Sequence, residues 1–291
     1  MFKKILKIIG FVLGGIVLLA GIFYAKVYFS IEKRLHTVYD VKPQAVAIRS
    51  DSATLALGGR LVKAKGCTDC HGSDLGGGVF IDDPALGFLV ARNLTKGRGG
   101  FPADRTIDDW VLALKHGLNT QRTPLLFMPS HEYAHLSEHD MGAIIAYCEQ
   151  LPKVDRELPE SSVGPLGKIL ADLDKLPLFP AEMIDHNSVL IKEMKPEVTV
   201  EFGKYLSTAC QGCHRENMKG GEPVAPGFPV VADISSTGNP GRWTDEQFIT
   251  TLRTGVTPEG KTLKQSEMPW AMTKAFTDVE LKALHLYLKQ L

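Results

Sequence analysis

The sequence predicts an all-α protein in which two tandem copies of one small helical domain follow an N-terminal transmembrane helix. Three observations support this fold class: a five-residue motif that occurs twice, an internal repeat with a shift of about 140 residues, and an uncharged apolar stretch near the N-terminus. Internal copies matter most, because overlooking them leads to the wrong fold. The alternation of apolar and polar residues typical of strands is not evident, so no sheet is expected.

The N-terminal segment carries three lysines, Lys3, Lys4 and Lys7, and then runs without a charge from Ile8 to Ala25. Such a stretch is just long enough to span a bilayer, with Lys26 reaching toward the interface. By the positive-inside rule the lysines keep the N-terminus in the cytoplasm, which places the rest of the chain outside. A cleaved signal peptide is the alternative, although the stretch is not followed by a small-x-small cleavage site.

The pattern Cys-x-x-Cys-His occurs at residues 67–71 and again at residues 210–214. It is the attachment signature of a c-type haem, in which two thiols form thioethers and the adjacent His binds the iron. A zinc site would need further Cys or His close by, and a thioredoxin-like motif would need a βαβ context. The sequence therefore predicts two covalently bound haem c groups, held by Cys67, Cys70, Cys210 and Cys213, with His71 and His214 as iron ligands.

Both halves carry the same order of helical signals. A helix is expected over residues 55–65 before the first motif and over residues 200–208 before the second. Later in each half, a Ser or Thr followed three residues on by an acidic or amide side chain indicates a helix start, and a glycine gives a plausible stop. These signals are Thr106 to Asp109, Ser137 to Asp140, Thr244 to Gln247 and Thr277 to Glu280, with stops at Gly117 and Gly255.

Each half resembles a class I cytochrome c domain. The order in that family is an N-terminal helix, C-x-x-C-H, a Gly-rich loop, a middle helix, a Met-Pro loop and a C-terminal helix. The tandem arrangement is similar to the cytochrome subunits of membrane-bound bacterial dehydrogenases that oxidise alcohols or sugars, which generally carry three haem domains. The expected organisation is an anchor over residues 1–29, a stalk over 30–49, haem domains over 50–151 and 197–291, and a linker over 152–196 that includes a helix near residues 166–176.

The resemblance implies that Met128 and Met268 are the distal iron ligands. Both precede a proline, which favours the extended backbone of a crossing loop, and they align in the repeat. A lone Met is more often core filler, and Met272 competes with Met268. Ligation of an iron by two histidines is the other alternative, with candidates His116, His131, His135, His139 and His285.

The charge balance is even, with 33 basic and 33 acidic residues, which argues against a nucleic-acid partner. The leading interpretation is an electron-transfer protein, without catalytic residues, between a membrane dehydrogenase or quinol-oxidising complex and a terminal oxidase or soluble carrier. Its haem domains would lie on the periplasmic side of a bacterial cytoplasmic membrane. One alternative is a di-haem peroxidase-type enzyme with His131 or Glu132 as acid/base group. The other is a haem-bearing subunit of a larger respiratory complex.

Overall fold

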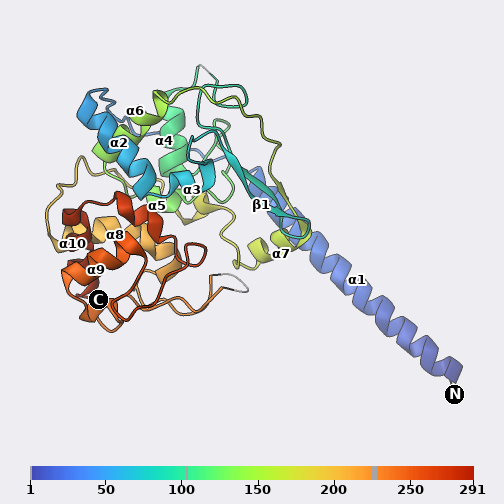
Figure 1. The fold of residues 1–291 in the computed structure, drawn as a ribbon. Coiled ribbons are helices and arrows are strands. Elements are labelled where there is room, and N and C mark those ends of the chain that lie inside the picture. The colour runs from blue at the N-terminus through green and yellow to red at the C-terminus, as the bar shows by residue number, and fades with distance from the viewer. Residues whose placement is uncertain (1, 103, 225–227) are drawn as a thin grey trace.

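The computed structural model describes residues 2–102, 104–224 and 228–291. A long helix, α1 (Phe2–Leu35), projects from a rounded head that contains two helical halves (Figure 1). The first half contains α2 (Ser52–Ala64), α3 (Cys67–His71), α4 (Ile107–His116), α5 (Ser130–Tyr133) and α6 (Glu138–Glu149). The second contains α8 (Val200–His214), η2 (Pro240–Arg242), α9 (Asp245–Thr254), η3 (Trp270–Ala275) and α10 (Asp278–Leu288). The predicted fold class, mostly helical and tandem, is confirmed.

In each half the first and last long helices cross at a glycine. A Cβ on Gly58 of α2 would overlap the carbonyl oxygen of Ala143 in α6, and a Cβ on Gly203 of α8 would overlap that of Ala283 in α10. Both alanines are fully buried. Because glycine has no side chain, the two helix backbones can approach this closely. The two halves therefore share one crossing geometry, as the internal repeat implies.

Replacing Gly58 with alanine is expected to lower the free energy of unfolding by about 1–3 kcal/mol, because the added methyl group overpacks the helix crossing. Gly203→Ala should act in the same way in the second half. Urea denaturation followed by far-UV circular dichroism measures both. Gly59→Ala is the control, since the Cβ there meets only the ring of Tyr147, a side chain that can turn away. Equal losses in Gly58→Ala and Gly59→Ala would contradict the prediction.

The helix boundaries follow the predicted capping signals. Thr106 with Asp109 and Thr244 with Gln247 form complete capping boxes at α4 and α9. Both helices then end at a glycine in the left-handed region, Gly117 with φ 66° and Gly255 with φ 72°, a conformation that side chains disfavour. Local sequence therefore decides where these helices begin and end.

A small antiparallel sheet corrects the expectation that the chain has no strands. It consists of β1 (Gly78–Asp83), β2 (Gly87–Ala91) and β3 (Ser162–Val163), in that order. A bulge between Val79 and Ile81 breaks the alternation of β1. Every residue of β2 is at least partly buried. Neither strand therefore shows the period of two that would have revealed it.

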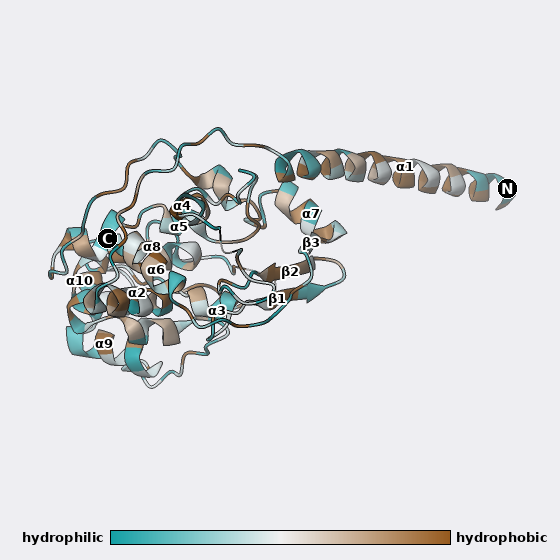
Figure 2. Cartoon of the chain, turned by 90° about the horizontal axis from the view of Figure 1, so that it is seen from above, coloured by the Kyte–Doolittle hydropathy of each residue, from teal (hydrophilic) through white to brown (hydrophobic). Residues whose placement is uncertain are grey.

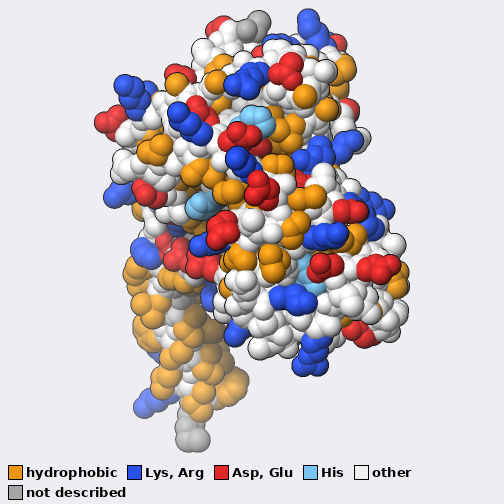
Figure 3. Space-filling view, turned by 90° about the vertical axis from the view of Figure 1, so that its left-hand side faces the viewer, with side chains coloured by type: hydrophobic (Ala, Val, Ile, Leu, Met, Phe, Trp, Pro, Cys, Tyr) orange, Lys and Arg blue, Asp and Glu red, His pale blue; other side chains and the backbone are white. Residues whose placement is uncertain are grey.

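Among the described residues, α1 is the one helix that is long and apolar enough to cross a membrane. In Figure 3 the projecting part of this helix is mainly hydrophobic with basic side chains near its tip, whereas the head carries interspersed basic and acidic side chains. The last turns of α1 differ, because Val27 and Ile31 are fully buried. They pack against the segment between the two halves, which includes α7 (Pro165–Asp172) and η1 (Pro180–Met183). Figure 2 shows α7 beside the base of α1.

The later part of the same segment covers α4 of the first half. The Lys115 ammonium donates to the backbone oxygen of Ser188. His116 is fully buried, and its Nδ1 lies 3.0 Å from Nδ1 of His186, with the two rings stacked. The segment is therefore an ordered part of the head rather than a free tether.

Acid is expected to weaken this packing. Burial, together with Lys115 and His186, lowers the pKa of His116 to about 4. The unfolded chain takes up this proton near pH 6.5, so the free energy of unfolding should fall as the pH drops from about 6.5 toward 4. Urea denaturation at pH 7 and pH 5 measures the difference, which should shrink in His116→Gln. The exposed His135→Gln is the control, and an unchanged pH dependence in His116→Gln would overturn the prediction.

Candidate haem sites and the contact between them

The two motif histidines each make the same kind of hydrogen bond, from Nδ1 to a backbone carbonyl oxygen. His71 closes α3 and its Nδ1 lies 2.7 Å from the backbone oxygen of Arg92, while His214 closes α8 and its Nδ1 lies 2.8 Å from that of Ala232. A carbonyl oxygen only accepts, so Nδ1 carries the proton and donates it, and Nε2 keeps its lone pair. This is the tautomer that an iron ligand requires, with the ring orientation held by the carbonyl.

Burial lowers the pKa of both imidazoles, which favours the neutral ring. Sequence reasoning had not identified the two carbonyl acceptors. A signal was nevertheless present, because Arg92 and Ala232 stand immediately before Asn93 and Asp233, which are equivalent positions of the repeat. The residues of both motifs thus fit a covalently attached haem in donor chemistry and tautomer.

The four motif cysteines form no disulfide, and all of them lie within the described residues. Burial raises the pKa of Cys67 and of Cys210 to about 12, and it also raises the pKa values of Cys70 and Cys213. Reactive redox cysteines have lowered pKa values instead. The raised pKa values are thus unlike those of a thiol–disulfide exchange centre, and the four free sulfur atoms fit thioether bonds.

The two Met-Pro loops have the same backbone turn. The Ser130 N–H donates to the Met128 oxygen and the Trp270 N–H donates to the Met268 oxygen, both at 2.7 Å. The intervening prolines have ψ of 52° and 59°, which is typical of an inverse γ-turn. Both methionines are partly buried against the core. The repeat therefore extends to the local geometry of the residues that were predicted as distal ligands.

The competing methionines of the second half are placed elsewhere. The sulfur of Met272 lies 3.9 Å from the position of a Cβ on Gly66, so it faces the first half. Met218 is fully buried and has a left-handed backbone with φ 58°, which matches Leu75 with φ 55° in the first half. A position that takes leucine in one copy has no need of a thioether, so Met218 is a core residue.

Two of the candidate histidines are engaged in packing. His285 is fully buried, with Nδ1 2.7 Å from Asp245 and Nε2 2.9 Å from the backbone oxygen of Pro240. Its ring stacks on Phe248. Because both nitrogens are occupied, His285 cannot also bind iron in this arrangement. His116 pairs with His186 and so belongs to the contact with the linker.

Comparison with known proteins agrees with this geometry. A model of the cytochrome c family matches residues 55–152 and residues 200–291, which together make up more than half of the chain and include both motifs. The chain belongs to the cytochrome c family. Domains of this family imply covalently bound haem c, and an electron-transfer role follows from it.

One relative of this cytochrome is the gluconate 2-dehydrogenase cytochrome c subunit of Pantoea cypripedii. The two are 30% identical over 112 residues, a stretch that covers 34% of this chain and 25% of that relative. The chain thus matches about a quarter of the relative's length. The expected similarity to cytochrome subunits of bacterial dehydrogenases is confirmed over this matched stretch.

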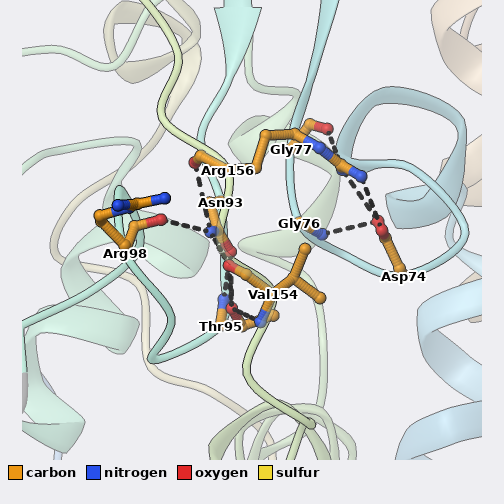
Figure 4. A network of polar contacts seen from close by, with 8 residues as sticks. All are labelled: Asp74, Gly76, Gly77, Asn93, Thr95, Arg98, Val154 and Arg156. Atoms are coloured by element: carbon orange, nitrogen blue, oxygen red, sulfur yellow. Dashed lines mark hydrogen bonds and ion pairs between the residues drawn. The ribbon is translucent and has the colours of Figure 1, made fainter.

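The loop that presents the Arg92 carbonyl is held by the start of the linker (Figure 4). Asn93 is almost fully buried; its Oδ1 accepts the Thr95 N–H at 2.9 Å and its Nδ2 donates to the Val154 oxygen at 2.7 Å. In the second half Asp233 accepts the Ser235 N–H in the same way, but its other oxygen accepts the Thr237 hydroxyl at 2.7 Å. The partner of the second side-chain atom therefore explains the difference between the copies. The Val154 oxygen requires a donor, which an amide supplies, and the Thr237 hydroxyl donates to a carboxylate.

Asn93→Asp is expected to lower the free energy of unfolding of this cytochrome by about 1–3 kcal/mol, because a carboxylate oxygen would face the Val154 oxygen without a proton between them. Asp233→Asn is the matched control and should change it far less, since the Thr237 hydroxyl can accept as well as donate. Urea denaturation of both variants at pH 7 gives the comparison. The interpretation is wrong if Asp233→Asn is the more damaging change.

The two halves of the cytochrome dock through a pair of equivalent contacts. Arg60, two residues after the crossing glycine of α2, binds Glu280 with an Nη1–Oε2 distance of 2.6 Å. Tyr205, two residues after the crossing glycine of α8, donates its hydroxyl to Asp140 at 2.6 Å. Glu280 and Asp140 are equivalent residues in the first turns of α10 and α6. The first helix of each half therefore contacts the start of the last helix of the other half.

A second pair of contacts brings the haem motifs to the same interface. Glu132, four residues after Met128, has its Oε1 2.9 Å from the position of a Cβ on Gly212, inside the second motif. Met272, four residues after Met268, lies correspondingly beside Gly66, just before the first motif. Burial raises the pKa of Glu132 to about 7, against the opposing effect of Lys65. Glu132 thus belongs to the contact between the halves.

Proposed function

We propose that this cytochrome is a membrane-anchored di-haem electron carrier. It passes single electrons from a respiratory donor, either a dehydrogenase or a quinol-oxidising complex, to an oxidase or a soluble carrier. The observation that carries the proposal is the duplicated site, in which each copy combines the attachment motif, a His fixed at Nδ1 by a carbonyl, and a Met-Pro turn. The haems are held by Cys67, Cys70, Cys210 and Cys213, and the axial ligands are His71, Met128, His214 and Met268.

When bound, haem c supplies a one-electron iron couple. The residues of the chain decide its potential and its access to other molecules. A Met thioether opposite His raises the reduction potential, as in other cytochromes c. His71 with Met128, and His214 with Met268, would each hold one iron and would leave it no open site for an added ligand. One apolar core, which includes residues of both halves, packs against the first cysteine of each motif, Cys67 and Cys210.

The contact between the halves supports a direct path between the two haems. Glu132 and Met272 bring the segment after each Met-Pro turn against the motif of the other half. Arg60 and Tyr205 hold the two halves in this arrangement through short polar contacts. Both attachment sites therefore lie close to one interface, so electrons can cross inside the chain without a diffusing partner.

Anchoring is part of the same proposal. The apolar α1 is the membrane span, its lysines stay in the cytoplasm, and the haem domains lie on the periplasmic side of a bacterial cytoplasmic membrane. The similarity to a dehydrogenase cytochrome subunit supports a dehydrogenase as electron donor. The proposed division is an anchor over 1–29, a stalk over 30–49, haem domains over 50–151 and 197–291, and a linker over 152–196.

The test is a redox titration of the full chain purified in mild detergent, followed by additions of carbon monoxide and of peroxide. Two one-electron transitions, no spectral response to carbon monoxide and no peroxide consumption are expected of an electron carrier. A ferrous iron that binds carbon monoxide, together with peroxide turnover, would instead establish the peroxidase-type alternative. Copurification with a dehydrogenase would identify the donor.

A further inference from the structure

The helix α7 packs on the part of α1 that lies just beyond its uncharged stretch. Lys26, the first charged residue after that stretch, binds Asp172 at the C-terminal end of α7 at 2.8 Å. Lys168, in the middle of α7, binds Glu32 of α1, also at 2.8 Å. Six residues of α helix rise only about 9 Å, so α7 lies within that distance of the end of the hydrocarbon-length segment. Figures 1 and 2 show α7 beside α1 at this level.

The outward face of α7 is apolar. Leu166 and Leu173 are 42% and 51% exposed, and Leu170 between them is half-buried. These three positions follow the spacing of one helix face, while Gly167 and Ala171 on the other face are buried. An amphipathic helix in a water-soluble head normally turns its apolar face inward. In α7 the small residues Gly167 and Ala171 are buried instead, and the leucines point away from the core.

The neighbouring turn of α1 also exposes aromatic side chains, and Nζ of Lys168 in α7 lies 4.1 Å from the centre of the Tyr28 ring. Tyr28 and Phe29 are 41% and 70% exposed, and they lie beside the residues that bind α7. Aromatic side chains are enriched at the boundary between hydrocarbon and headgroups. Two carboxylates that join the helices, Asp172 and Glu32, are both paired with lysines, which reduces the cost of removing them from bulk water. Asp174, directly after Leu173, is exposed. The exposed leucines of α7 and the exposed aromatic residues of α1 thus lie on two helices that pack together just beyond the uncharged stretch.

We propose that α7 is an interfacial membrane helix. Its apolar face enters the headgroup region of the bilayer in which α1 is anchored. This face consists of Leu166, Leu170 and Leu173, and Tyr28 and Phe29 of α1 enter the same region. The inference rests on the proposed anchoring of α1 and gives the linker a role. The head is then held against the membrane at two places, so its orientation is restricted instead of varying freely about a stalk.

Site-directed spin labelling of the full chain, with both haems attached and reconstituted in phosphatidylcholine vesicles, tests this. A single cysteine is introduced in four separate variants: Leu166→Cys, Leu173→Cys, Ile16→Cys in the middle of α1, and Val189→Cys. Val189 is the matched control, an exposed apolar linker residue that follows the contact with α4. The motif cysteines are occupied by haem and Cys148 is buried, so the label reports on the new position.

The measured quantity is the ratio of collisions with oxygen, which concentrates in lipid, to collisions with a water-soluble nickel chelate. The ratio at positions 166 and 173 should be several-fold higher than at 189 and lower than at 16. If the collision ratios at positions 166 and 173 equal the ratio at position 189, while position 16 gives a high ratio typical of lipid, α7 faces water and the inference is wrong. If position 16 also resembles 189, the anchoring of α1 itself fails, which contradicts the proposed function separately.

Discussion

Replacing Cys67 and Cys70 together with alanine is expected to lower the number of covalent haems per chain from the proposed two to one. Alanine has no sulfur, so neither thioether of the first site can form, and His71 alone does not hold a porphyrin covalently. Replacing Cys210 and Cys213 with alanine should remove the haem of the second half in the same way. The pyridine haemochrome content per chain, measured after acid extraction of non-covalent haem, reports the number directly.

The matched control for this loss is Cys148→Ala. Cys148 lies on α6, is 4% exposed, and has its pKa raised by burial, as a core thiol should. This variant should retain both haems. An unchanged haem content in the double variants would refute the assignment of the motifs. We also expect the double variants to unfold at lower urea concentration, because each half is small and loses the apolar bulk around which it packs.

Met128→Ala is expected to open the iron of the first half to carbon monoxide and to lower its reduction potential. A thioether from Met128 would stabilise the reduced iron, and iron ligands tune haem potentials over a range of about 0.8 V. The drop should therefore be large compared with that from any surface substitution. Met268→Ala should produce the same change in the second half. Carbon monoxide difference spectra and a spectroelectrochemical titration of the full chain measure the two effects.

Met272→Ala is the control for the second half. Its sulfur faces Gly66 of the first half, so its removal should leave both potentials and both iron sites unchanged. A carbon monoxide response in Met272→Ala, with none in Met268→Ala, would transfer the distal role to Met272. Met141→Leu serves the same purpose in the first half, because Met141 is fully buried in α6.

Much of the fold could be predicted because its signals are local. The capping boxes of α4 and α9, and the glycines that end these helices, depend on atoms within a few residues of each other. The repeat then doubled each observation, because every signal of the first half could be compared with its counterpart in the second. The sheet was missed for an equally local reason, since the bulge between Val79 and Ile81 removes the alternation on which a strand prediction depends.

The surroundings of the candidate sites were less accessible. The attachment motifs indicate their own chemistry. The carbonyl that orients each histidine, however, belongs to a residue about twenty positions later, and only the equivalent residues next to it, Asn93 and Asp233, mark its place in the sequence. Asn93 reaches even farther, to the Val154 oxygen in the linker. Such partners become neighbours only when the chain is folded, so composition and spacing do not reveal them.

The N-caps of the two final helices show which features sequence decides and which tertiary structure decides. The sequence by itself determined that α6 and α10 begin at Ser137 and Thr277, because a side-chain oxygen there can accept the N–H three residues on. Only the tertiary structure decided the rest. The N–H of Ser137 donates to the hydroxyl of Tyr205, 68 residues away, whereas the box at Thr277 closes locally and its Glu280 also binds Arg60. A hydrogen bond between distant residues forms only where docking of the halves brings donor and acceptor together, and that geometry is a property of the whole chain.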